Sequence, residues 1–330
     1  MGLGDGYRAF DRFQQRHGWL GFPLAVQQKY SDDQGGYLAS TITYYAFFSI
    51  FPLLLVLTTG LGYVLVGHPH LAHDIVNSAL GQFPVIGREL KAGSLKGSAL
   101  AVGIGLAGAL WAGMRAVLAS ESALNQIWGV PYTERPTFLH SRLRALGLLL
   151  ILGGGILAAT ALGGAATAAG GPGLAVKAGS IVLSTILDFA IVWSSFRILI
   201  AAEASWRDLW VGAAVAAVGY ELLQLAGGYY VGHTLANASN TYGTFALVIG
   251  LLSYLYLAVH VVLLGAETSV VSARRLWPRS LSLLGQRPPT PGDVAALRQR
   301  GEVEVRRFDE RIEVEIPKDG GPVSQPPTAE

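Results

Sequence analysis

Long runs of apolar residues separated by short polar segments dominate the pattern of this chain. The run 37–66 carries no charge, and the run 98–128 carries only Arg115 and Glu121. Both exceed the roughly 20 helical residues that cross a hydrocarbon layer of ~30 Å. Pro52 removes an amide donor within the first run and predicts a helix kink there. The pattern predicts an all-α polytopic membrane protein with six transmembrane helices, at about residues 37–66, 98–128, 143–169, 174–202, 206–231 and 242–272.

Three polar segments flank or interrupt the transmembrane domain, which we place at residues 37–284. Residues 1–36 have aromatic positions three and four apart, which predicts an N-terminal helix that is either interfacial or solvent-exposed. Residues 67–97 hold two short amphipathic pieces and are predicted to lie on the outer membrane surface. Residues 285–330 are predicted to form a cytoplasmic tail. In it, the alternating segment GEVEVRRFDERIEVEIP predicts a small hairpin, with disorder or docking on a partner as open alternatives.

Composition supports the membrane class and excludes several others. The chain is 51% hydrophobic and 14% charged, against about 25% charged in ordinary soluble domains. Its net charge of +2 is too small to indicate nucleic-acid binding. The absence of cysteine excludes disulfides and thiolate chemistry. The histidines at positions 68, 70 and 73 have no second set of ligands nearby, so neither a metal nor a cofactor is predicted.

Lysine and arginine residues predict the orientation, because short cytoplasmic loops are enriched in them. With the N-terminus inside, the cytoplasmic segments hold thirteen such residues and the opposite side holds four. The asymmetry predicts that both termini are cytoplasmic. That arrangement requires an even number of spans, in agreement with six.

Several predicted helices carry charged or polar side chains at membrane depth, where such groups are costly and often functional. Arg115 lies near the middle of its span, so it is predicted to face a partner or a water-filled space inside the bundle. It either binds an anionic headgroup or pairs with an acid that only fixes helix packing, and both interpretations stay open. The candidate substrate-binding residues are Arg115, Glu121, Asn125, Asp188, Glu221, Gln224, His260 and Glu267.

Three segments of the chain resemble the YihY/BrkB family of bacterial inner-membrane proteins, once labelled ribonuclease BN and now often called envelope integrity proteins. They are TYYAFFSIFPLLL at 43–55, ESALNQIWGVP at 121–131 and YGTFALVIGLLSYLYLAVHVVLLGAETSV at 242–270. The similarity covers roughly residues 30–275 and leaves out the C-terminal tail. It implies a six-helix plasma-membrane protein of the bacterial envelope, with envelope lipid handling as a candidate role.

Two functions follow as hypotheses. The first is transport or flipping of a lipid or other amphiphilic anion through a polar cavity in the bundle, with membrane lipids or a lipid-linked precursor as partners. The alternative is a membrane-anchored envelope scaffold that transports nothing and whose tail recruits a partner. A ribonuclease is disfavoured because the acids sit singly on separate apolar helices. We therefore predict no enzymatic activity, and leave homo-oligomerisation open.

Overall fold

The computed structural model describes residues 3–64, 99–168, 174–230, 236–281 and 289–314. This part of the chain is helical and contains no strand, which confirms the all-α prediction for it. The predicted surface segment 67–97, with its three histidines, lies outside these residues. Six of the described helices have 25 or more residues; they are α3 (Gly35–Val64), α5 (Ala99–Ile127), α6 (Phe138–Ala168), α7 (Leu174–Leu199), α8 (Trp206–Tyr230) and α9 (Ala236–Ala273).

Four segments of these helices are long and apolar enough to cross a membrane, within the residues described. They are Gly103–Ile127, Ile181–Leu199, Trp206–Gly227 and Val248–Ala273, which belong to α5, α7, α8 and α9. Many of their large apolar side chains are exposed on the outside of the bundle, as expected where lipid replaces water. The chain is therefore an integral membrane protein. Helix α3 continues without a break through Pro52, where the sequence predicts a kink.

Close contact between two glycines sets the packing of α8 on α9. A Cβ atom placed on Gly265 would lie 2.5 Å from the carbonyl oxygen of Gly212 and 2.7 Å from the Cβ of Ala216. Real side-chain carbons do not approach that closely, so only glycine fits there. Small residues that let helix backbones meet are the usual means of helix association in membranes, because apolar side chains gain little from leaving lipid.

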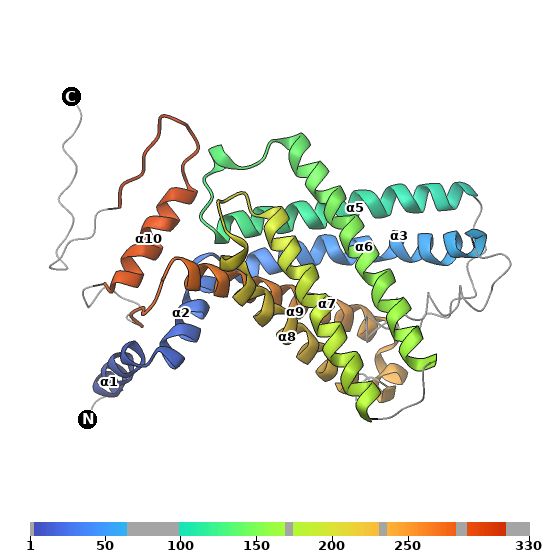
Figure 1. Cartoon of the computed structure of the whole chain (residues 1–330), viewed down its shortest axis with the longest axis horizontal. Coiled ribbons are helices and arrows are strands. Elements are labelled where there is room, and N and C mark those ends of the chain that lie inside the picture. Colours follow the sequence, from blue (N-terminus) through green and yellow to red (C-terminus); the bar gives the residue numbers. More distant parts are fainter. Residues whose placement is uncertain (1–2, 65–98, 169–173, 231–235, 282–288, 315–330) are drawn as a thin grey trace.

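The segments before and after the long helices pack together at one end of the bundle. They are α1 (Leu3–Arg16), α2 (Gly18–Asp32) and α10 (Pro291–Val303), which Figure 1 shows at the same end. Arg279, in the loop after α9, joins them. Its guanidinium contacts Asp32 at 2.7 Å and Asp293 at 3.1 Å. Arg279 therefore connects the N-terminal helix α2 to the C-terminal helix α10 at this end of the bundle.

Helix α10 corrects the prediction for the tail. Thr290 and Asp293 form a reciprocal capping box, and Pro291 follows the cap at the first helical position, where its missing amide costs nothing. The helix takes in the first residues of the segment predicted as a hairpin, and positions 304–314 after it contain no strand. The alternation of apolar and charged residues extends over only a short segment, whereas the capping box stabilises the start of a helix just before it. An isolated two-stranded hairpin also has only marginal stability.

Candidate functional site

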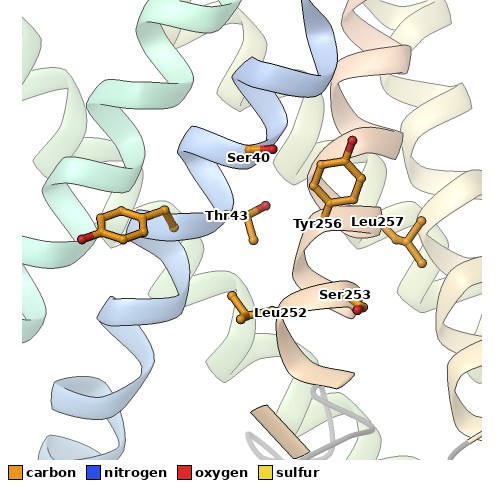
Figure 2. Close-up of a pocket in the computed structure, with 7 residues that line it drawn as sticks. Ser40, Thr43, Leu252, Ser253, Tyr256 and Leu257 are labelled. Carbon is orange, nitrogen blue, oxygen red and sulfur yellow. The ribbon is translucent and has the colours of Figure 1, made fainter. Parts of the chain in front are cut away.

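A groove between α3 and α9 is the main candidate site. Its volume is about 560 Å³, and it is lined by Ser40, Thr43, Tyr44, Leu252, Ser253, Tyr256 and Leu257. Figure 2 shows Ser40 and Thr43 on α3 across the gap from Leu252 and Tyr256 on α9. The Thr43 hydroxyl is buried without a hydrogen-bond partner. The groove thus combines apolar walls with hydroxyl-bearing side chains, of which Ser40 already donates to the carbonyl of Gly36 at 2.8 Å.

Helical spacing places Ser253, Tyr256, His260 and Glu267 on one face of α9, and this polar stripe runs from the groove toward α2. Tyr256 lines the groove, and one turn further on His260 lies beside it, with ring centroids 6.1 Å apart. The Nδ1 atom of His260 shares a hydrogen bond of 2.6 Å with the hydroxyl of Tyr30 on α2. His260, a predicted site residue, is therefore engaged by another helix. It sits between the groove and the end of the bundle.

A buried ionic cluster lies at the end of this stripe. Glu267 is fully buried, and its carboxylate is 3.7 Å from the ammonium of Lys29 on α2. Lys29 also pairs with Asp33 and donates a hydrogen bond of 3.1 Å to the backbone carbonyl of Ile127 at the end of α5. Burial raises the pKa of Asp33, and the nearby ammonium of Lys29 only partly offsets this. One lysine faces two carboxyls, so the cluster is neutral when one of them holds a proton.

Two predicted site residues on α5, Asn125 and Glu121, make contacts that join helices. The Asn125 amide donates to the carbonyl of Leu199 at 3.2 Å and accepts from the amide of Ala201 at 2.7 Å, which caps the end of α7. Glu121 is buried and accepts a hydrogen bond of 3.2 Å from Ser141 near the start of α6. These contacts tie α5 to α6 and α7, and neither residue lines the groove.

Three other candidates lie on α7 and α8, away from the groove. Glu221 accepts a hydrogen bond of 3.1 Å from Ser184, and Asp188 lies one turn beyond Ser184 on the same helix. Gln224 is half-buried on α8. The predicted polar residues therefore fall into separate clusters, not one shared cavity. A second cavity, of about 240 Å³ between α3, α5, α8 and α9, has a mostly apolar lining that includes none of the eight candidates.

Arg115 does not face the bundle interior, contrary to the prediction. Its side chain is exposed on the outer surface of α5, where its guanidinium lies 5.5 Å from the ring centroid of Trp111, which is 62% exposed. It forms no ion pair with any residue in the described ranges. The helical wheel places Arg115 and Trp111 on one face correctly, but it cannot say whether that face meets a neighbouring helix or lipid.

Sequence reasoning missed the partners of the α9 stripe. Lys29 contributes only to the count of basic residues that predicts the orientation, and no role is predicted for Asp33. The i,i+4 spacing of Lys29 and Asp33 was a usable signal, because residues four apart share a helix face. Nothing in the sequence shows that Glu267, more than two hundred residues later, lies against them.

These features define a polytopic helical membrane protein with a lateral groove and several buried polar clusters. The chain belongs to the BrkB family, since the family model described as "Virulence factor BrkB" matches residues 26–284. This confirms the resemblance to the YihY/BrkB proteins. Helix α10 lies beyond the matched region.

Relatives with curated descriptions agree on the membrane location. The chain is 27% identical over 312 residues to a UPF0761 membrane protein of Methylibium petroleiphilum, an alignment that covers 86% of this chain and 71% of that protein. It is 34% identical over 171 residues to a UPF0761 membrane protein of Stenotrophomonas maltophilia, covering 49% and 39%. It is 24% identical over 270 residues to the inner membrane protein YhjD of Escherichia coli, covering 73% and 78%. No solved structure shows a significant match.

Proposed function

We propose that this protein binds an amphiphile, such as a membrane lipid or lipid-linked precursor, in the groove between α3 and α9 and moves it across a bacterial inner membrane. In this proposal all six long helices span the bilayer, and the protein catalyses no covalent step. The groove replaces the interior polar cavity expected from the sequence, because the polar side chains form separate clusters.

The groove itself is the observation that carries the proposal. It opens on the side of the bundle between two long apolar helices, and its lining places the exposed Ser253 hydroxyl beside leucine side chains. Hydroxyls can donate to phosphate or hydroxyl oxygens of a headgroup, while an acyl chain can lie against the apolar wall. No cation is among the lining residues, so the recognition we propose is by hydrogen bonding and not by charge pairing.

Filling the groove tests this function. In proteoliposomes, the wild type should accelerate the transfer of a fluorescent phosphatidylglycerol or phosphatidylethanolamine between leaflets. Ser253→Trp places a bulky ring in the groove and should reduce the accelerated rate by about tenfold or more, the equivalent of 1.4 kcal/mol in the barrier. Ile249→Trp is the matched control, because Ile249 is 62% exposed one turn away on α9 and does not line the groove.

Two results would contradict the proposal. One is a wild-type rate equal to that of empty liposomes with every probe. The other is a Ser253→Trp protein that is folded and as fast as the wild type.

Orientation has its own test. We propose that both termini are cytoplasmic, because the basic segments after α5, α7 and α9 lie at the end where α1 and α2 pack. The chain has no cysteine, so single cysteines report sidedness without background. Glu203→Cys, in the loop between α7 and α8, should react with a membrane-impermeant reagent only in inverted vesicles. Gly171→Cys, between α6 and α7, should react only in right-side-out cells, and the reverse pattern would refute the orientation.

A scaffold that transports nothing is the second candidate, and the packing of the terminal segments favours it. Helix α10 is held to the membrane domain by Arg279 and by Gln299, which donates to the carbonyl of Ile127 at 3.0 Å. Such a docked helix offers a defined surface to a partner. Removing residues 289–330 should then leave an envelope defect of cells that lack this protein uncorrected, although the truncated protein still inserts into the membrane. A truncated protein that corrects such a defect would exclude this role.

A further inference from the structure

Two acidic side chains, Asp188 on α7 and Glu221 on α8, are neighbours, and neither lines the groove. Asp188 and Glu221 are close enough to repel each other electrostatically. The Ser184 hydroxyl, one turn before Asp188, donates to Glu221 at 3.1 Å. None of the ion pairs within the described residues includes either acid. Among the described residues, the pair therefore has no basic side chain that neutralises it.

Both acids lie deep along apolar helices. Asp188 stands eleven residues before the end of α7 at Leu199, or ~16 Å along the axis, and Glu221 stands fifteen residues after the start of α8 at Trp206, or ~22 Å. Both positions fall within the segments that are long and apolar enough to span a membrane. Ionised carboxylates at such depth are costly unless something neutralises them.

An independent observation from α9 marks the same place. Tyr254 is 6% exposed, and its hydroxyl has no hydrogen-bond partner although it lies within electrostatic reach of both acids. The Tyr220 hydroxyl is close to it but without hydrogen-bond geometry. The Oδ2 atom of Asp188 is likewise buried and unpartnered. Buried polar atoms without partners are rare in folded proteins, and here two of them belong to the same group of neighbouring side chains.

We propose that Asp188, Glu221, Ser184 and Tyr254 form a binding site for one monovalent cation, either a proton or Na⁺. A proton would be shared by the two carboxyls, with the Ser184 and Tyr254 hydroxyls donating to the remaining negative charge. Na⁺ would take the carboxylate and hydroxyl oxygens as ligands, in keeping with the preference of hard cations for oxygen. In both cases the cation relieves the repulsion between two acids that form no ion pair with a basic residue in the described ranges.

Cation binding should stabilise the folded protein, because the unfolded chain separates the two acids. We would measure the unfolding temperature of the protein in lipid nanodiscs, once over a pH range in sodium-free buffer and once over rising Na⁺ at constant ionic strength and high pH. The double variant Asp188→Asn with Glu221→Gln removes both carboxylates. Glu203→Gln is the matched control, because Glu203 is an exposed acid in the loop after α7.

The expected result is an unfolding temperature that rises by about 2–4 °C for each tenfold increase in the concentration of the free cation, once that concentration exceeds the dissociation constant. A folded state that binds more protons than the unfolded state gains stability as the pH falls. The Lys29 cluster also binds a proton through Asp33, so a proton at the Asp188 and Glu221 site is identified by a rise on lowering the pH that is larger in the wild type than in the double variant. A rise with Na⁺ at fixed pH identifies Na⁺. The double variant should lose the Na⁺ dependence or show the smaller pH dependence, and Glu203→Gln should behave as the wild type.

The proposal is overturned if wild type and double variant show the same dependence on pH and on Na⁺. If the double variant does not fold, Tyr254→Phe serves instead, since it removes only a hydroxyl; it should weaken the dependence, and an unchanged dependence overturns the proposal. The measurement uses no lipid substrate and no groove residue. Its failure would leave the proposed function standing, and a failed lipid-transfer assay would leave this site standing.

Discussion

Removing the Lys29 ammonium should destabilise the protein strongly. Lys29 lies between Asp33 and the fully buried Glu267, and its own side chain is 4% exposed. Lys29→Met keeps the length of the side chain and removes the charge, which leaves two buried carboxyls facing each other.

The structure sets the size of this effect. A unit-charge pair near 4 Å interacts by about 4 kcal/mol at an effective dielectric constant of about 20. Breaking a buried ion pair on one side typically costs about 3–5 kcal/mol, since the remaining charge is uncompensated. The Ile127 carbonyl adds little to the loss, because Gln299 still donates to it at 3.0 Å. We therefore expect the free energy of unfolding to fall by about 3–5 kcal/mol and the unfolding temperature by roughly 10 °C.

Thermal unfolding in detergent or nanodiscs measures the change, with Arg311→Met as the control because the Arg311 side chain is 88% exposed. The triple variant Lys29→Met, Asp33→Asn, Glu267→Gln should recover most of the lost stability, because neutral groups replace all three charges. A Lys29→Met protein within about 2 °C of the wild type would refute the reasoning. So would a triple variant as unstable as the single one, since packing and not charge would then be the cause.

Three further changes test other contacts. Gly265→Val should prevent α8 from packing on α9, because even a Cβ atom there would lie 2.5 Å from the Gly212 carbonyl oxygen. The yield of folded protein should drop sharply, and normal yield and stability would contradict this close contact. Asn125→Ala should lower the free energy of unfolding by about 1–3 kcal/mol, because the buried end of α7 loses its cap. Thermal or denaturant unfolding measures this change, and a change below the error of the assay would show that the cap is dispensable. Arg279→Ala should expose the α10 segment to limited proteolysis while the transmembrane part stays resistant, and unchanged cleavage would show that the other contacts of α10 suffice.

The hydrophobic pattern predicts most of the helical architecture. The apolar run expected at 98–128 appears as α5, Ala99–Ile127, and the run expected at 174–202 as α7, Leu174–Leu199. Helical spacing also puts the residues of the polar stripe on one face of α9, and the structure brings that face to α2 and α3. This succeeds because helical spacing alone decides which residues share a face.

Contacts between distant segments could not be predicted in the same way. Arg115 was placed inside on the argument that a charge avoids lipid, yet it lies on the outer surface of α5. Asn125 was placed in a substrate cavity, yet it caps α7. In each case the residue type signals that a partner is needed, but the partner depends on how whole helices are arranged.

The amino-acid sequence by itself determined that this is a helical membrane protein, where its long helices run and which side chains share a helix face. These properties depend on local hydropathy and on the helical repeat. The tertiary structure alone decided that α3 and α9 leave a groove, that Lys29 meets Glu267, that α10 closes the end of the bundle and that Arg115 points outward. Neighbouring helices and lipid are almost equally apolar, so hydropathy cannot tell a face that packs from a face that lies in the membrane.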